Sequence, residues 1–481
     1  MSSAIIWLRR DLRLHDNPAW HYAAQAHDTV IPVYIHAPDE ESPWQPGAAS
    51  RWWLHHSLQS LQAALRERGE RLIIRQGDSL TQLRSLLEAS QADAVYWNRL
   101  YDPATRSRDQ QIKQALREEG WQADSFNSAL LWEPWTVKTQ AGEPYKVFTP
   151  FWKACCRHLP TPPLAAPDVL APPANDVLNQ LASLPLEALE LRPKISWDGG
   201  LQSSWQVGET GAWTRLEQVC EQVVDDYSNT RNLPALDGVS RLSPHLHFGE
   251  LSPRQIWQAV AERFDGTPLE HLSAAAYLRE LGWREFAHHV LFYWPESPVQ
   301  AMNERFRAMP WRQDYAADLA RWQHGRTGIP LVDAGMRELW QTGWMHNRVR
   351  MIVASFLSKN LLIPWQEGTR WFWDTLVDAD LANNSMGWQW TAGCGVDAAP
   401  YFRVFNPVRQ GEQFDPDGDY VRRWVPELAA VPIRWVHQPW NLPAEQQRQA
   451  KFQPGVSYPL PMVDLAASRK RALGAYEQIK G

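Results

Sequence analysis

Side chains able to stack, hydrogen-bond and carry electrons are concentrated between Trp340 and Pro407. The stretch includes W-Q-T-G-W-M-H-N-R-V-R-M, then D-A-D-L-A-N-N-S-M-G-W-Q-W, and it closes on D-A-A-P-Y-F-R-V-F-N-P. A plain core is aliphatic and a plain surface uses few tryptophans, so neither explains this mixture of indoles, amides, guanidiniums and carboxylates. The stretch therefore predicts a pocket that stacks flat rings, hydrogen-bonds their edges and passes electrons.

A second group consists of Tyr227 and the sequence G-V-S-R-L-S-P at 238–244. The hydroxyls of Ser240 and Ser243, the Arg241 guanidinium and the backbone N–H groups of a helix entrance would suit a diphosphate. The local pattern by itself favours a simpler interpretation, a helix cap beside a surface arginine.

The sequence Y-L-R-E-L-G-W-R-E-F at 277–286 is the third group. At helical spacing Tyr277, Glu280 and Arg284 share one face, and Trp283 lies one turn from Glu280. Two interpretations are open. The face either carries an ordinary surface ion pair, or it projects a carboxylate and an indole into a cavity.

The fourth group, G-W-M-H-N-R-V-R-M at 343–351, places two arginines in an otherwise apolar helix. Such charges are costly to bury without partners, so we expect Asp378 or Asp380 to pair with Arg350. The nearby G-C-G-V-D-A at 393–398 formally matches a dinucleotide fingerprint, but no strand precedes it and no βαβ unit surrounds it.

The elements that must position these groups differ between the two ends of the chain. Short apolar runs at 4–8, 30–36, 72–75 and 94–97 alternate with amphipathic patterns at 51–68 and 106–119, which predicts a parallel, Rossmann-like α/β sheet. From about residue 210 the pattern is helical, and it includes one long helix over 330–362. We expect an α/β domain at 1–135, a Pro-rich connector at 136–210 and an all-α domain at 211–481.

Composition limits the classes of protein that remain. The net charge is −6, so any contact with nucleic acid must come from a local basic patch. The four cysteines have no C-x-x-C spacing, which argues against a metal site and fits a reducing cytoplasm. The start of the chain lacks the pattern of a signal peptide, and no run is long enough to span a membrane. We expect a cytoplasmic monomer with no bound metal.

Taken together, the four groups closely resemble the photolyase/cryptochrome family. The match covers nearly the whole chain, from the opening I-W-L-R-R-D-L-R-L-H-D-N through S-R-L-S-P, W-R-E-F and T-G-W-M-H-N-R-V-R-M to D-A-A-P-Y-F-R-V-F-N-P. It is strongest to cyclobutane pyrimidine dimer photolyases. The segments W-N-R-L-Y-D-P from Trp97 and L-L-W-E-P-W from Leu130 are similar to the bacterial class related to plant cryptochromes.

This resemblance implies that the helical domain binds FAD. The positions that match the family's flavin site are Tyr227, Val239, Ser240, Arg241, Leu242, Ser243, Tyr277, Arg284, Asn347, Arg350, Asp378, Ala379, Asp380 and Asn384. Among them Asn384 resembles the amide that faces flavin N5 and favours the reduced state. The first six would hold the diphosphate side of the cofactor.

The resemblance also implies a light-driven lyase that repairs ultraviolet-damaged DNA. The excited, reduced flavin donates one electron to a flipped-out dimer, the cyclobutane ring splits and the electron returns. Glu280 resembles the carboxylate that stabilises the dimer. The predicted contacts to the lesion and to DNA are Arg231, Glu280, Trp283, Asn347, Arg348, Met351, Trp390 and Gln410. An electron relay from flavin to surface would use Trp388, Trp365 and Trp311.

Related proteins with other activities are the alternatives. A (6-4) photolyase would carry His where Asn347 and Met351 stand. A cryptochrome, a blue-light receptor without repair, would lose Trp283, place Asp at position 384 and carry a long C-terminal tail. A flavin-binding structural module would not need Glu280. Thr105 stands where folate-binding relatives use Glu, so the antenna site differs; we favour methenyltetrahydrofolate, with deazaflavin as the alternative.

Overall fold

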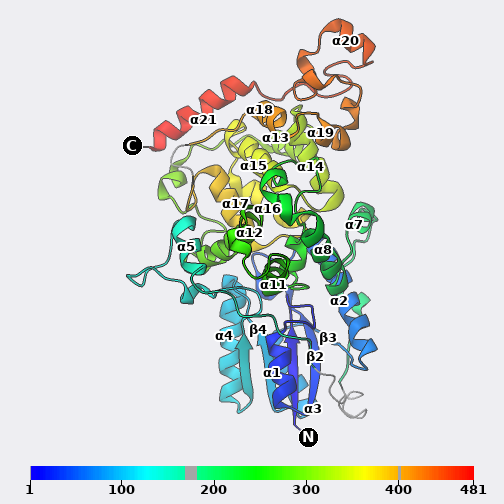
Figure 1. Cartoon of the computed structure of the whole chain (residues 1–481), viewed down its shortest axis with the longest axis vertical. Helices are drawn as coiled ribbons and strands as arrows, with labels where there is room; N and C mark the ends of the chain where they lie inside the picture. The colour runs from blue at the N-terminus through cyan, green and yellow to red at the C-terminus, as the bar shows by residue number, and fades with distance from the viewer. Residues whose placement is uncertain (1, 168–180, 399–401, 481) are drawn as a thin grey trace. The chain divides into compact units, whose positions relative to one another are not determined.

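The computed structural model describes residues 2–167, 181–398 and 402–480 of the chain (Figure 1). Part of the predicted connector (168–180) and part of the D-A-A-P-Y motif (399–401) lie outside the described residues. The chain divides into two compact units. Unit 1 comprises Met1–Asp225 and Ser240–Pro295, and unit 2 comprises Asp226–Val239 and Glu296–Gly481. The two domain boundaries expected from composition, after residues 135 and 210, stay a prediction, because contacts within the chain and composition divide the sequence by different criteria.

Unit 1 contains a five-stranded sheet whose strand order is β3-β2-β1-β4-β5. All pairings are parallel. The strands are β1 Ser3–Leu8, β2 Thr29–His36, β3 Ile73–Gln76, β4 Ala94–Asn98 and β5 Gln122–Phe126. The four predicted strands are confirmed. Strand β5 was not predicted, because its sequence Q-A-D-S-F is half polar and lies at an edge of the sheet.

The sheet is buried on both faces, which explains the continuous apolar runs of its central strands. Alternate residues such as Ile5 and Trp7 pack with Leu83 of α3 (Ser79–Ser90) and Leu116 of α4 (Pro103–Glu118). Helix α1 (Pro18–Ala26) packs on β1 and β4. Helix α2, the longest in this half of the unit, spans Ala48–Glu67. Helices α1, α3 and α4 thus pack on the sheet, as in open α/β folds.

The remainder of unit 1 is helical. Its helices are α5 Phe148–Cys155, α7 Gly199–Ser204, α8 Glu209–Gln222, α10 Ser243–His247, α11 Pro253–Arg263 and α12 Leu272–Tyr293. Helix α11 begins with a capping box, in which the Ser252 hydroxyl accepts from the Gln255 N–H and the Gln255 side chain accepts from the Ser252 N–H. Helix α12 carries Tyr277, Glu280, Trp283 and Arg284.

Unit 2 is built of helices around one apolar core. They are α9 Tyr227–Thr230, α13 Ala316–Gln323, α14 Pro330–Thr342, α15 Asn347–Ser355, α16 Trp365–Thr375, α17 Leu381–Ala392, α18 Pro407–Phe414, α19 Asp419–Trp424, α20 Ala444–Gln449 and α21 Leu465–Ile479. The core includes Trp365 and Trp388, so two of the three predicted relay tryptophans are also packing residues. Together with unit 1, these elements confirm the predicted fold class.

The single helix expected over 330–362 is wrong. Helix α14 ends at Gly343, whose φ of 68° lies in the left-handed region that glycine adopts without steric cost. Helix α15 then starts afresh, capped by the His346 side chain, which accepts from the Arg348 N–H at 3.2 Å. It ends in a π-helical turn, Phe356–Asn360. The break places Asn347 at the start of a helix, where it is exposed.

Candidate functional site

The predicted diphosphate group of unit 1 centres on Arg241, whose φ of 54° is left-handed. A non-glycine residue held in this conformation is strained, and such residues cluster at ligand sites. Around it, the Tyr277 hydroxyl hydrogen-bonds Ser240, and Arg215 Nε donates to the Ser240 carbonyl at 2.8 Å. Burial raises the pKa of Tyr277, so its hydroxyl stays protonated. Ser243 begins α10, with Leu242 buried just before it, so the expected helix entrance is confirmed.

Helix α12 fixes the indole of Trp283. The ring stacks on Phe148 with a centroid distance of 3.6 Å and an interplanar angle of 9°. On the next turn toward the N-terminus, Glu280 is half-buried. A stacked indole has little rotational freedom, so this side chain can form a rigid wall.

Arg284 has partners within unit 1. It donates to the Ala129 carbonyl at 2.7 Å and lies 3.2 Å from Glu285, whose side chain is fully buried. Burial raises the pKa of Glu285. Arg284 therefore joins α12 to the 129–132 segment. In the same segment, the N–H groups of Leu131 and Trp132 donate to the Glu285 carboxylate. Its predicted flavin contact stays a prediction.

In unit 2 the ion pair expected of Arg350 is confirmed. Its guanidinium donates to both oxygens of Asp378, at 2.8 and 3.1 Å, and to the Met345 carbonyl at 2.7 Å. Asp380 caps α17 by accepting from the Asn383 N–H. One residue later in the helix, Asn384 donates through Nδ2 to the Thr369 carbonyl at 3.1 Å, which sets the orientation of its amide. Ala379, which stands between Asp378 and Asp380 in the sequence, is buried.

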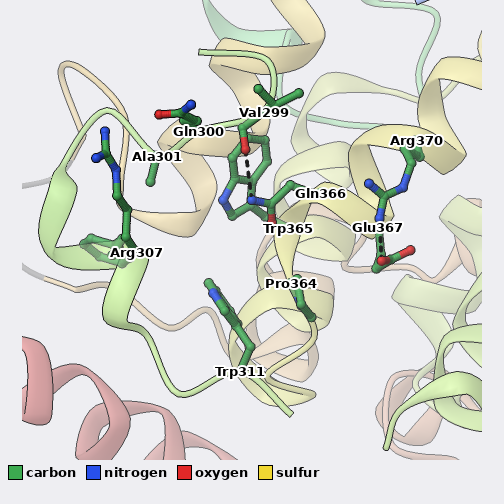
Figure 2. Close-up of a pocket in the computed structure, with 11 residues that line it drawn as sticks. Val299, Gln300, Ala301, Arg307, Trp311, Pro364, Trp365, Gln366, Glu367 and Arg370 are labelled. Carbon is green, nitrogen blue, oxygen red and sulfur yellow. Dashed lines mark hydrogen bonds and ion pairs between the residues drawn. The ribbon is translucent and has the colours of Figure 1, made fainter. Parts of the chain in front are cut away.

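The three relay tryptophans lie on neighbouring elements of unit 2. Trp388 on α17 is 2 % exposed and packs edge-on against Phe372, and a Cβ on Gly368 would clash with its ring. Gly368 lies one turn along α16 from Trp365, which is 1 % exposed. Trp365 and the half-buried Trp311 line one open cavity (Figure 2). Exposure thus increases at the end of the series, as a relay to the surface requires.

Arginines of unit 2 gather where DNA contacts were predicted. Arg348 donates to Asn232 Oδ1 at 2.7 Å, which joins α15 to the segment of Arg231, and Arg231 in turn lies over the Tyr227 ring at 5.7 Å. Burial, followed by the positive charges of Arg231 and Arg403, lowers the pKa of Arg348. Arg403 was missed by the sequence analysis. Arg403 is the first residue of the R-V-F-N-P motif, but nothing in the sequence places it beside Arg348.

The other predicted site residues lie on separate elements of unit 2. Met351 lies one helical turn after Asn347 on α15. Trp390 donates through Nε1 to the Asp397 carbonyl at 3.0 Å. Gln410 is 9 % exposed, and its buried Oε1 accepts from no donor among the described residues. Val239 is the last residue of the short segment that belongs to unit 2.

A second missed residue is Lys359, on the π-helical turn. Its side chain is 3 % exposed, its ammonium donates to the Arg403 carbonyl, and it lies 4.4 Å from the centre of the Phe402 ring. Burial lowers the pKa of Lys359 to about 7 and raises that of its neighbour Cys394 to about 12. A buried lysine without a carboxylate partner is unusual, and π-helical turns frequently occur at functional sites.

Comparison with known families gives two matches along the chain. The family model described as DNA photolyase matches residues 4–168, and the FAD binding domain of DNA photolyase matches residues 277–478. The chain belongs to the DNA photolyase family, which confirms the family predicted from its motifs.

Relatives of two kinds are similar to the chain over its whole length. A deoxyribodipyrimidine photo-lyase of Agrobacterium fabrum is 45% identical over 99% of this chain and 98% of its own. Cryptochrome-1 of Arabidopsis thaliana is 38% identical over 99% of this chain and 70% of its own. Among solved structures, a bacterial class III photolyase from Agrobacterium tumefaciens superposes with a TM-score of 0.93 at 43% identity, covering 100% of this chain and 98% of that one.

The second fold relative is a cryptochrome of Synechocystis, with a TM-score of 0.88 at 32% identity over 99% of both chains. Photolyases and cryptochromes share the fold, so the fold by itself does not separate the two activities. Within the described residues, no helix combines the length and apolar character needed to cross a membrane.

Proposed function

We propose that this protein is a deoxyribodipyrimidine photo-lyase, which uses light to split cyclobutane pyrimidine dimers in DNA. The observation that carries the proposal is the full-length similarity to a photo-lyase, 45% identical over 99% of this chain. The residue types on α12 and α15 agree with it, since Glu280, Trp283, Asn347 and Met351 are all present. FAD, which the matched domain binds, supplies on excitation the electron that opens the dimer.

Within each unit, taken by itself, the residues present have chemistry suited to a part of FAD. In unit 1 the strained Arg241 and the hydrogen-bonded Ser240 and Tyr277 offer a guanidinium and hydroxyls to a diphosphate. In unit 2 the oriented amide of Asn384 and the Asp378–Asp380 pair offer groups to a ring edge and to ribityl hydroxyls. The buried Trp388 Nε1, which has no partner among the described residues, is a polar atom left for a ligand or water.

The protein itself has three tasks in the proposed reaction. Glu280 would hydrogen-bond the lesion and favour its reduced form, and Trp283, held by Phe148, would form one wall of the lesion pocket. In unit 2, Asn347 and Met351 would contact the lesion. Positively charged side chains would position the DNA backbone.

For that last task we assign Arg231, Arg348 and Arg403, with Gln410 and Trp390 as additional contacts. The support is electrostatic. Arg348 lies close enough to Arg231 and Arg403 for their charges to lower its pKa, and phosphate groups would relieve this repulsion. A local cluster of this kind is what a chain with a net charge of −6 needs to bind DNA.

We assign Trp388, Trp365 and Trp311 to electron transfer toward the cofactor when it is oxidised. Their order along neighbouring elements and the greater exposure of Trp311, at the end of the series, support the assignment. Trp388→Phe should block light-driven reduction of oxidised flavin but spare repair by chemically reduced enzyme. A variant that is photoreduced at the normal rate would remove Trp388 from this role.

For the antenna we propose methenyltetrahydrofolate, with a deazaflavin as the alternative. In unit 1 the carboxyl ends of β1 and β4, where open sheets bind ligands, are filled by side chains. Arg9 pairs with Asp109 at 2.9 Å, and Asn98 donates to Asp11 and Asn17. We therefore propose that the antenna binds beside these side chains, near Trp44 or the turn after Trp97. Absorption spectra of extracted chromophores distinguish the two; light scattering tests whether the protein is monomeric, and cell fractionation tests its cytoplasmic location.

The decisive experiment is repair of defined lesions. Under blue light, reduced protein should restore a thymine-dimer oligonucleotide and leave a (6-4) product unchanged. Glu280→Ala should lower the quantum yield several-fold while leaving DNA affinity within about twofold, because a charge-assisted hydrogen bond to the lesion is lost. The matched control is Glu262→Ala, an exposed glutamate on α11. DNA binding without light-driven repair would instead favour the cryptochrome-type photoreceptor, to which the chain is also similar.

A further inference from the structure

Unit 2 contains an open cavity of about 460 Å³ between the 299–311 segment and the first turn of α16. Its volume lies within the range of small-molecule sites. Figure 2 shows Trp311 entering from one side, with Trp365 and Gln366 at the centre, Gln300 and Arg307 on one flank and Arg370 on the other. All of the residues that line it belong to unit 2.

Two indoles form its apolar wall, and they are the two outer members of the proposed relay. Trp365 lines the cavity but is only 1 % exposed, so little of its ring is accessible. Trp311 is half-buried and lines the same cavity. A flat molecule in the cavity would therefore stack mainly on Trp311, beside Trp365.

The polar groups of the cavity define what else such a molecule must carry. Arg370 is already paired with Glu367, which also accepts from the Tyr315 hydroxyl at 3.1 Å. Arg307 has only a loose partner, Glu304 at 3.6 Å, and both side chains are mostly exposed. Of the two guanidiniums, Arg307 is therefore the one available to an anionic group.

Gln366 adds a second requirement. Its Nε2 donates to the Val299 carbonyl at 3.3 Å, while its Oε1 is buried and accepts from no donor among the described residues. A buried acceptor without a partner is unfavourable unless a ligand or water supplies the donor. A complementary ligand thus combines a flat ring, an N–H donor and an anionic group.

We propose that this cavity is a docking site for a soluble reductant, a flat heterocycle with an N–H donor and a phosphate, that returns an electron to the relay. The proposal rests on the proposed function, since it needs the relay. Dihydronicotinamide nucleotides and reduced flavin mononucleotide share this chemistry. A reductant bound here would lie against the terminal indoles instead of meeting Trp311 by collision.

The proposed step transfers one electron from the donor to Trp311. The docked reductant gives one electron to the radical cation that the relay leaves on Trp311, and that indole returns to its closed-shell state. No bond to the protein forms. The donor radical releases a proton to water, and its remaining electron serves a second turnover or passes to a second donor radical. The cavity then exchanges oxidised donor for fresh donor.

Docking and collision differ in how the rate depends on donor concentration. The test uses FAD-loaded, oxidised protein in blue light and three donors: reduced nicotinamide mononucleotide, reduced flavin mononucleotide, and the phosphate-free 1-benzyl-1,4-dihydronicotinamide. We expect the rate of flavin reduction to saturate with at least one phosphate-bearing donor and to remain linear with the phosphate-free one. Comparison of the two nucleotides shows whether the site prefers a nicotinamide or a flavin ring. Linear dependence for all three would overturn the proposal.

Binding is measured separately in the dark. The oxidised nucleotides should bind saturably in equilibrium dialysis, and Arg307→Glu should weaken this binding by about tenfold, as expected for a lost charge-assisted contact. The matched control is Arg305→Glu, an exposed arginine on the same short helical segment that does not line the cavity. Equal losses in the two variants would exclude a specific site.

Repair by dithionite-reduced wild-type protein reports the proposed function independently. Without repair, the proposed function fails, whereas dark binding still decides whether the cavity holds a nucleotide. With repair but neither saturation nor dark binding, the docking site alone fails.

Discussion

Several buried charges of unit 1 lie in pairs of opposite sign, whereas the charged cluster of unit 2 that we assign to DNA brings like charges together. In unit 1, Arg254 pairs with Asp16 at 2.7 Å, and Arg9 pairs with Asp109 in the sheet crevice. In unit 2, Arg348 lies near Arg231 and Arg403, and its own contacts are Asn232 and the Phe414 ring.

This difference separates charges that are held in pairs of opposite sign from charges that lie near others of the same sign. A buried pair of opposite sign costs desolvation, but removing one member is worse, so such a pair fixes geometry. Like charges repel and lower stability until a polyanion neutralises them. Unit 2 also has ordinary pairs, such as Arg337 with Glu427 at 2.8 Å. The like-charged cluster is therefore local, and its place coincides with residues predicted to contact DNA.

The largest effect should follow from breaking the buried network of unit 1 at Arg13, which is 1 % exposed. Its guanidinium donates to the carbonyls of Asp16 and Gly249, at 2.6 and 2.8 Å, and to Ser128 Oγ at 2.8 Å. Arg13→Met leaves these acceptors buried without a donor and should lower the free energy of unfolding by about 3–5 kcal/mol. Urea denaturation measures the change.

The control for that experiment is Arg66→Met, at an exposed position of α2, which should change the stability by less than about 0.5 kcal/mol. If Arg13→Met were equally mild, the buried guanidinium of Arg13 and its hydrogen bonds would not hold the fold of unit 1, and the comparison between the units would lose its first half.

The next effect concerns Lys359, whose charged neighbours are Arg403 and, when ionised, Cys394. Burial lowers its pKa from 10.5 to about 7, so between these values the unfolded chain keeps a proton that the folded chain has lost. Stability should therefore rise with pH in this window, by up to about 1.4 kcal/mol per pH unit. Relative to Lys359→Met, the wild type should gain about 2 kcal/mol between pH 7 and 9.

Urea denaturation at several pH values checks this, with the difference between wild type and Lys359→Met isolating the single group. Lys470→Met, on the exposed side of α21, should run parallel to the wild type. A constant difference between the wild type and Lys359→Met would mean that the buried ammonium keeps its ordinary pKa.

Much of the fold could be predicted because burial leaves a clear pattern. The three central strands are apolar on both faces, and all of them were predicted, together with the edge strand β3. Strand β5 was missed because an edge strand needs only one neighbour and tolerates polar residues. The long helix over 330–362 was wrong because apolar periodicity continues across the break, whereas a single Gly343 ends α14.

Most residues of the site could be predicted because they stand in recognisable motifs. The residues that were missed are those whose contacts lie far away along the chain. Arg350 and Asp378 could be paired because both stand in recognisable motifs. Lys359 and Arg403 are 44 residues apart, and Arg348 and Asn232 are 116 residues apart. No local pattern brings such residues together. The roles assigned to the site residues stay predictions until variants are measured.

A smaller effect, on DNA binding, should follow from removing one member of the like-charged cluster. Arg403→Ala should weaken binding to damaged and undamaged DNA by a similar factor, about tenfold at 0.1 M salt. The slope of log affinity against log salt should fall by about 1, since one phosphate contact is lost. Fluorescence anisotropy over a range of salt concentrations measures both quantities.

Arg337→Ala is the matched control, because Arg337 belongs to the same unit but pairs with Glu427. It should leave the salt slope unchanged. If the two variants lost affinity equally, total charge would explain DNA binding, and the distinction between paired and clustered arginines would have no functional meaning.

The smallest effect is expected from the exposed pair of Arg263 and Asp225 in unit 1, 2.7 Å apart with side chains 48% and 50% exposed. An exposed ion pair gains little because water screens it and two long side chains lose freedom. The coupling energy from a double-mutant cycle with Arg263→Ala and Asp225→Ala should stay below about 0.5 kcal/mol. A coupling above about 1 kcal/mol would show that opposite sign alone stabilises unit 1, wherever the pair lies. A value near zero, beside a large loss at Arg13, would show that charges fix the fold of unit 1 only where burial removes the alternative partner, water.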